Sequence, residues 1–251
     1  MTRHPIVALW SHPRSVSTAF ERIMRSRGDL ACLHEPFMYD YYVHRSTKVM
    51  PHFEAQPEHP VSYAEIRTLI LKKAETGPVF FKDMSYYVMP HIMEDAAFVD
   101  RITHSFLIRD PMASIVSYAK LDPDVSRDEI GLEAQWHHAA ALQARGLPVT
   151  VVQSEKVQND PVGQMCAYWK AVGLPDRPQA LQFGDDVPAD WQQVSGWHAD
   201  VMASKSILPW TDADVARTQT QFSALVSRAP RFAEFHAHHT PFHARLAALA
   251  L

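Results

Sequence analysis

A turn rich in hydroxyl groups follows the first apolar run of the chain and carries one arginine, Arg14. The turn reads Ser-His-Pro-Arg-Ser-Val-Ser-Thr over residues 11–18, and an amphipathic helix begins within it. Free N–H groups and the dipole at a helix N-terminus attract anions, and a guanidinium group matches the oxygens of phosphate or sulfate. The hydroxyl groups of Ser15, Ser17 and Thr18 add donors. The segment predicts an anion-binding loop, although Ser and Thr before a helix also serve as plain caps.

A second arginine, Arg109, ends another apolar run, Ser-Phe-Leu-Ile over residues 105–108. Open α/β sheets bind ligands at the carboxyl ends of their strands, and buried strands seldom end in arginine without an anionic partner. If a helix begins at Pro111, Ser117 lies about two turns into it and could share an anion with Arg109. The alternative is that Arg109 pairs with Asp110 or with a surface carboxylate.

Up to about residue 173, apolar runs alternate with segments that have the periodicity of a helix, and these elements must position the residues named above. Short, continuous runs rich in β-branched and aromatic residues are typical of buried parallel strands. Helix starts are predicted at Ser62, which has Glu65 three residues later, and at the Asp-Pro pairs of residues 110–111 and 160–161. The predicted strands are Ile6 to Trp10, Leu30 to Leu33, Val79 to Phe81, Ser105 to Ile108 and Val149 to Val152. We therefore predict an α/β fold with a central parallel sheet flanked by helices.

The length of the chain suits a single domain over residues 1–251. Residues 36–60 mix aromatic and polar side chains, as a lid over a ligand pocket would, or as a surface excursion with partly buried rings would. Residues 174–251 are expected to form a helical and irregular C-terminal part.

Together, the two arginine segments resemble the nucleotide-binding motifs of sulfotransferases that use 3'-phosphoadenylyl sulfate (PAPS). The first motif is a Pro-Lys/Arg-Ser-x-Ser/Thr-Thr loop for the 5'-phosphosulfate, and the second is an Arg-x-Pro...Ser segment for the 3'-phosphate. Residues 13–20, Pro-Arg-Ser-Val-Ser-Thr-Ala-Phe, are similar to one subgroup of the family. Residues 149–161 and 168–175 resemble later elements, so that the resemblance covers about residues 5–175. It implies a P-loop NTPase-like sulfotransferase fold and PAPS as donor, with adenosine 3',5'-bisphosphate as product.

The resemblance also assigns donor contacts along the chain. Many family members have glycine where Val16 stands, so the side chain of Val16 is expected to point away from the ligand. A match near residues 196–206 suggests a further phosphate contact from Lys205. The implied donor-binding residues are Arg14, Ser15, Val16, Ser17 and Thr18 at the 5' end, Arg109 and Ser117 at the 3'-phosphate, and Lys205.

Sulfuryl transfer requires a base for the acceptor and positive charge near the departing oxygens, as phosphoryl transfer does. We expect Arg14 to stabilise the leaving group and Lys82, at the end of the third strand, to supply a second cation, unless Lys82 only pairs with Asp83. Glu35, in a Glu-Pro pair after the second strand, is the preferred base, as in carboxylate-using relatives. Asp83 and His34 are its rivals, and a helix cap or ion pair is the structural alternative for Glu35.

Composition argues against several other classes of protein. The formal charge is 24 − 28 = −4, which gives no general basic surface for nucleic acid or an anionic membrane. Two cysteines, with no signal-peptide pattern and no long apolar run, favour the cytoplasm. We expect a small-molecule acceptor, with residues 36–60 as its lid, and leave a homodimer open.

No metal is expected, because sulfuryl transfer from PAPS does not require one. The C-terminal histidines are expected on a solvated tail and the His-His pair of residues 137–138 on a helix surface; the C-terminal ones are His236, His238, His239 and His243. The sequence thus predicts transfer of a sulfuryl group from PAPS to a hydroxyl or amine of a small molecule. The alternatives are a nucleotide-dependent phosphotransferase of related fold and a nucleotide-binding pseudoenzyme.

Overall fold

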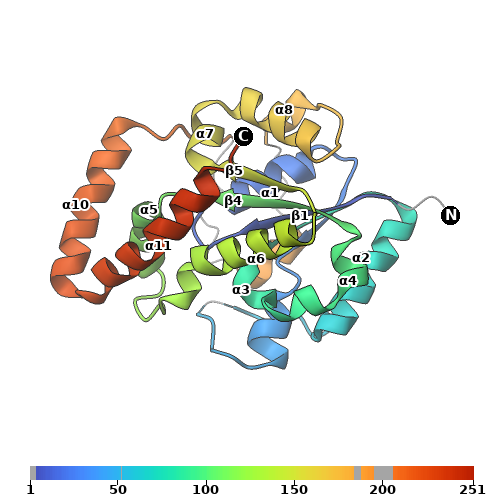
Figure 1. The fold of residues 1–251 in the computed structure, drawn as a ribbon, viewed down its shortest axis with the longest axis horizontal. Coiled ribbons are helices and arrows are strands. Elements are labelled where there is room, and N and C mark those ends of the chain that lie inside the picture. Colours follow the sequence, from blue (N-terminus) through green and yellow to red (C-terminus); the bar gives the residue numbers. More distant parts are fainter. Residues whose placement is uncertain (1–3, 52, 184–187, 195–205) are drawn as a thin grey trace.

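Five parallel strands form the centre of the molecule (Figure 1). The computed structural model describes residues 4–51, 53–183, 188–194 and 206–251. The strands are β1 (Ile6–Ser11), β2 (Ala31–His34), β3 (Val79–Met84), β4 (Ile102–Ile108) and β5 (Val149–Gln153). They lie in the order β2-β3-β1-β4-β5, and each neighbouring pair is parallel. The five predicted strands and the predicted fold class are confirmed.

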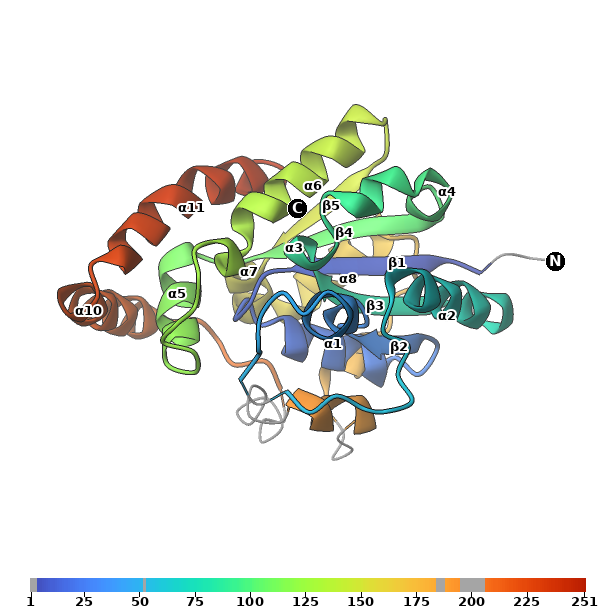
Figure 2. The ribbon, with the colours of Figure 1, turned by 90° about the horizontal axis from the view of Figure 1, so that it is seen from below.

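The side chains of the sheet alternate between two apolar layers, because successive residues of a strand point to opposite faces. In β1, Ile6, Ala8 and Trp10 pack on one side, and Val7 and Leu9 pack on the other. Helices α2 (Tyr63–Thr76), α6 (Leu132–Ala144) and α11 (Arg231–Ala247) cover the first side, whereas α1 (Ser17–Ser26) and α8 (Pro161–Ala171) cover the second (Figure 2).

The predicted helix starts are also confirmed. Ser62 and Glu65 form a capping box at α2. Asp110 accepts a hydrogen bond from Ala113 N and Asp160 accepts one from Gly163 N, each at 3.0 Å. The remaining elements are the π-helix η1 (Asp40–His44), the 3₁₀ helices η2 (His91–Glu94), η3 (Asp128–Ile130), η4 (Pro178–Leu181) and η5 (Ala189–Val194), and the α-helices α3 (Ser85–Val88), α4 (Ala96–Val99), α5 (Pro111–Ala119), α7 (Ser154–Asn159) and α10 (Asp212–Arg228).

Strand β3 continues past its predicted end at Phe81 as far as Met84. Lys82 and Asp83 therefore lie inside a fully buried strand, where the sequence placed them at its end. An ammonium group can be buried there because two carboxylates face it, as described below.

Residues 36–60 contribute to the core as well as to the surface. Phe37, Met38 and Tyr39 are fully buried. The ring of Tyr39 stacks on that of His59, with 3.7 Å between ring centroids. The first part of this segment is thus fixed by packing, and its role as an acceptor lid stays a prediction.

The C-terminal part folds into two long helices, α10 and α11, and the expectation for its histidines is wrong in one respect. His239 on α11 is fully buried, and its Nε2 lies 2.8 Å from the carbonyl oxygen of Arg127, just before η3. His138 on α6 is fully buried too, although a helix surface was expected, because it faces the ring of Trp10 with 4.7 Å between centroids. Within the described ranges, no group of three or more His, Cys, Asp or Glu could hold a metal ion, and no helix has the length and apolarity to cross a bilayer.

The buried histidines make the stability of the fold depend on pH. Burial lowers the pKa of His104 and His239 to about 4, and it holds the pKa values of His12 and His138 well below the usual 6.5. Unfolding lets these rings take up protons below about pH 6.5, so the free energy of unfolding should fall as the pH drops from 6.5 towards 4. Each such ring contributes up to ~1.4 kcal/mol per pH unit.

Urea unfolding at pH 7, 6 and 5 checks this prediction. His104→Asn should reduce the pH slope by about one proton, whereas His137→Asn, at a largely exposed position, should leave it unchanged. Equal stability of the wild-type protein at pH 7 and pH 5 would contradict the burial argument.

Candidate active site

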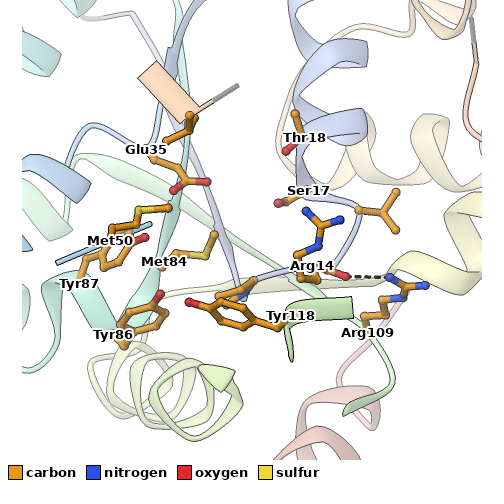
Figure 3. Close-up of a pocket in the computed structure, with 13 residues that line it drawn as sticks. Arg14, Ser17, Thr18, Glu35, Met50, Met84, Tyr86, Tyr87, Arg109 and Tyr118 are labelled. Atoms are coloured by element: carbon orange, nitrogen blue, oxygen red, sulfur yellow. Dashed lines mark hydrogen bonds between the residues drawn. The ribbon is translucent and has the colours of Figure 1, made fainter. Parts of the chain in front are cut away.

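The segments that follow β1, β2, β3 and β4 surround an open cavity at the carboxyl edge of the sheet, with an empty volume of about 840 Å³ that includes its open mouth (Figure 3). Parallel strands end at the same edge, which is where open α/β sheets place ligands. In Figure 3, Ser17, Thr18 and Arg14 lie on one side with Arg109 beyond them, and Glu35 lies on the opposite side. The residues predicted from sequence that line the cavity are Arg14, Val16, Ser17, Thr18, Glu35 and Arg109.

The N-terminus of α1 opens on this cavity without a capping side chain. No side-chain cap hydrogen bond is made at Val16, and the first turn holds no acidic residue. By contrast, the carboxylate of Asp110 caps the neighbouring helix α5. The first α-helical hydrogen bond of α1 runs from Phe20 N to Val16 O at 3.1 Å. As at any helix start, the N–H groups before Phe20 take no part in the hydrogen bonds within the helix. The end of α1 therefore suits an anionic ligand.

Ser15 supports this loop from inside. Its side chain is fully buried, and its hydroxyl group donates to the carbonyl oxygen of His12 at 2.7 Å. In this structure the hydroxyl group of Ser15 thus stabilises the turn, and the contact of Ser15 with the donor stays a prediction.

The two predicted arginines lie on the same rim of the sheet. Arg109 Nη1 donates to the carbonyl oxygen of Arg14 at 2.8 Å, and Arg14 Nε donates to Ser117 Oγ at 2.9 Å. The guanidinium carbon of Arg109 also lies 4.7 Å from the ring centroid of Trp210. Arg109 makes no ion pair among the described residues, so the alternative pairing with Asp110 is not observed. Arg14, Ser117 and Arg109 therefore form one connected cationic group.

Strained backbone is concentrated around the cavity. Among the described non-glycine residues, positive φ angles occur at Arg14 (63°), Val16 (67°), Glu35 (42°) and Ser46 (49°), and the first three line the cavity. Left-handed conformations cost non-glycine residues roughly 1–3 kcal/mol each and cluster at functional sites. The φ angle of Val16 explains why glycine suits this position in relatives. Its side chain packs against the core under α1, and the residue also contributes to the cavity lining.

Glu35 is held by a buried ion pair. Lys82 Nζ lies 2.5 Å from Glu35 Oε1 and 3.8 Å from Glu21 Oε2, and the lysine is fully buried. The carboxylate of Glu35 nevertheless points into the cavity (Figure 3), whereas Lys82 is not among the residues that line it. The structure thus shows Glu35 in the ion pair that was its structural alternative, while also placing it where a ligand can reach it. The partner of Lys82 is Glu35, and the proposed Lys82–Asp83 pair is not observed.

Glu21, on α1, is the buried centre of this charge network. Its carboxylate accepts hydrogen bonds from Arg25 Nε at 2.7 Å and Trp191 Nε1 at 2.9 Å, and lies 2.6 Å from His34 Nδ1. The neighbouring His34, Arg25 and Lys82 hold the pKa of Glu21 far below its usual range despite the opposing effect of burial. Glu21 was not predicted from the sequence, because only the folded chain brings this residue of α1 close to His34 of β2 and Lys82 of β3.

The rival bases lie outside the cavity lining. Asp83 is fully buried and accepts hydrogen bonds from Phe37 N at 2.7 Å and Met84 N at 2.9 Å; burial and the nearby Glu35 raise its pKa. His34 is buried against Glu21. Among the described residues, Glu35 is therefore the carboxylate that lines the cavity.

A second wall of the cavity was not foreseen from sequence. In Figure 3, Met50, Met84, Tyr86 and Tyr87 lie on the side of Glu35, and Tyr118 lies between them and Arg14. This wall can be found only in three dimensions, since its members come from four separate segments. They are Met50, Met84, Tyr86, Tyr87, Tyr118 and Val194. Lys205, the remaining predicted contact, lies outside the described residues.

Comparisons with known proteins agree with this fold. The model of a family described as "Sulfotransferase domain" matches residues 5–226. The sulfotransferase domain of the Synechococcus PCC 7002 olefin synthase is 17% identical, with a TM-score of 0.51 over 88% of this chain and 96% of that one. The sulfotransferase domain from the curacin biosynthetic pathway is 12% identical, with a TM-score of 0.50 over 90% and 98%.

A mouse sulfotransferase complexed with PAP is 11% identical, with a TM-score of 0.44 over 93% of this chain and 89% of that one. Curated protein sequences give no match. Because the family model covers most of the chain, the chain belongs to the sulfotransferase family. It is an α/β enzyme that transfers sulfuryl groups, as the sequence predicted. The family match ends before α11, so that helix lies beyond the matched region.

Proposed function

We propose that the chain transfers the sulfuryl group of PAPS to a hydroxyl or amine group of a small-molecule acceptor and releases adenosine 3',5'-bisphosphate. The main support for this proposal is the composition of one cavity. Two guanidinium groups and an uncapped helix N-terminus lie on one side of it, and the Glu35 carboxylate lies on the other. This arrangement fits a polyanionic donor facing an acceptor that must lose a proton.

The residues present fit such a donor. The Nε atom of Arg109 is buried and has no hydrogen-bond partner among the described residues. A buried donor without a partner is costly, and a phosphate oxygen would satisfy it. Arg109 and Ser117 would hold the 3'-phosphate, while Arg14, Ser17, Thr18 and the N–H groups of α1 would hold the 5' end. The contact of Lys205 remains a prediction, as does the cytoplasmic location.

When bound, PAPS supplies an activated sulfuryl group on a stable leaving phosphate. Glu35 takes the proton from the acceptor hydroxyl as its oxygen bonds to sulfur, and Arg14 neutralises charge on the departing side. Lys82 holds Glu35 in place through the 2.5 Å ion pair, so we assign Lys82 a positioning role beside its predicted electrostatic one.

Calorimetry with purified protein tests the donor, and mass spectrometry of acceptor mixtures tests the transfer. Micromolar or tighter binding of adenosine 3',5'-bisphosphate, with PAPS-dependent mass gain on an acceptor, is expected. Binding and transfer from labelled ATP without any from PAPS would overturn the proposed donor.

A further inference from the structure

Strands β1 and β4 part at their carboxyl ends, and side chains bridge the gap between them. Their paired register ends at Trp10 and Phe106. At this point the fully buried Gln135 of α6 donates from Nε2 to one carbonyl oxygen of each chain segment, at 3.0 and 3.1 Å. The next bridge is the ring of His12, whose Nε2 accepts a hydrogen bond from Arg109 N at 3.0 Å. His12 thus joins the two segments that carry the donor-binding arginines.

Arg109 is attached to the loop of His12 at both ends of its side chain. The ring of His12 holds the backbone N–H group, and the carbonyl oxygen of Arg14 accepts from Nη1 at 2.8 Å (Figure 3). The carbonyl oxygen of His12 also accepts the hydrogen bond of the Ser15 hydroxyl group at 2.7 Å, which stabilises the same turn. Two attachment points restrict the direction of the guanidinium group, whose buried Nε has no hydrogen-bond partner among the described residues.

The ring of His12 can accept this hydrogen bond in one protonation state only. Since Arg109 N is a donor, Nε2 of His12 must carry no proton, and the proton of the neutral ring is on Nδ1. Burial, together with the nearby His243 and His239 of α11 and with Arg109, holds the pKa of His12 well below the usual 6.5. The ring therefore stays an acceptor at neutral pH.

Close packing of α6 fixes the backbone of His12. Gly131, at the N-terminus of α6, has a φ angle of 82°. A Cβ atom at Gly131 would lie 3.1 Å from His12 Cβ and 3.5 Å from Pro13 Cδ, so α6 approaches the loop as closely as a glycine allows. The ring of His12 is thus held beside Arg109 from its own backbone.

On this basis, and resting on the proposed function, we propose that His12 is a positioning residue of the donor site. Its ring holds the backbone of Arg109, so that the guanidinium group is directed at the 3'-phosphate before the donor arrives. His12 itself contacts no part of the donor; it acts through Arg109, and its removal lowers donor affinity by letting Arg109 turn away.

Three substitutions of His12 separate this role from the filling of space. The side-chain oxygen of Gln can take the place of Nε2, Asn is as polar but too short, and Leu fills the volume without accepting a hydrogen bond. His12→Leu and His12→Asn should each weaken the affinity for adenosine 3',5'-bisphosphate by about tenfold or more, whereas His12→Gln should stay within about threefold of wild type. His137→Leu, at a largely exposed position of α6, is the control and should change nothing. Wild-type affinity in His12→Leu would overturn the inference.

A double-mutant cycle tests whether His12 acts through Arg109. In an Arg109→Ala background, His12→Leu should change the affinity by less than about twofold, because no guanidinium group is left to direct. A further tenfold loss in that background would show that His12 acts by another route and would overturn the assignment.

The same titrations distinguish this inference from the proposed function. Urea midpoints of all variants report whether they are folded, and His12→Asn replaces His12→Leu in both comparisons if the leucine variant does not fold. If wild-type protein binds adenosine 3',5'-bisphosphate and the His12 variants bind it equally well, the positioning role is wrong while the donor stands. If the wild-type protein does not bind this nucleotide, the proposed function itself fails.

Discussion

Glu35→Gln should lower kcat by about 10²- to 10⁴-fold while changing the affinity for adenosine 3',5'-bisphosphate by less than about twofold. The amide keeps the shape of the side chain but cannot accept the acceptor proton. Glu35 is the carboxylate among the cavity-lining residues, and it lies across the cavity from Ser17 and Thr18 (Figure 3). Donor affinity should therefore survive, because the donor contacts come from the other wall.

The control for this substitution is Glu75→Gln, an exposed carboxylate on α2 that should leave both quantities unchanged. Glu35→Gln also leaves Lys82 with only Glu21, 3.8 Å away, so its unfolding midpoint should be measured alongside kcat. A folded variant with turnover within about fivefold of wild type would show that another group takes the proton.

The second large effect concerns donor binding. Arg109→Ala should weaken the affinity for adenosine 3',5'-bisphosphate by roughly 30- to 4,000-fold, since truncating one partner of a buried charge pair costs about 2–5 kcal/mol. The guanidinium group has a buried Nε without a partner and one anchor on the carbonyl oxygen of Arg14, so its remaining donors are available to a phosphate. Calorimetric titration measures the change directly.

Arg14→Ala should weaken the same affinity and also lower kcat, because Arg14 is assigned to the departing side. Arg217→Ala, an exposed arginine paired with Asp214 on its own helix, is the matched control and should change neither. Unchanged nucleotide affinity in both Arg14→Ala and Arg109→Ala would remove the donor assignment altogether.

Local sequence patterns were enough to predict the frame of this protein. Buried strands such as Ile6–Ser11 are continuous apolar runs, and the Asp-Pro starts of α5 and α8 follow from capping rules that act within one turn. Arg14 and Arg109 could be brought together in advance, because parallel strands deliver their following residues to one edge.

Contacts across layers could not be foreseen in the same way. The pairing of Lys82 with Glu35 depends on the register between β2 and β3, where His34 lies beside Lys82 and Glu35 N donates to Lys82 O at 2.8 Å. Glu21 reaches this pair from α1, on which it is one turn past Thr18. The burial of His138 and His239 depends on how α6 and α11 rotate over the sheet, which their histidine-rich sequences do not indicate.

The left-handed backbone at Arg14, Val16 and Glu35 has a practical consequence for engineering. Replacing such a residue by glycine relieves the backbone strain and could be tried to raise stability, because glycine tolerates this conformation. Around the cavity the same change would also make the loops more flexible. The side chains of Arg14 and Glu35 would be lost or would no longer be held in fixed orientations toward the donor and the acceptor. Thermostabilised versions of the enzyme should therefore draw their substitutions from elsewhere in the molecule.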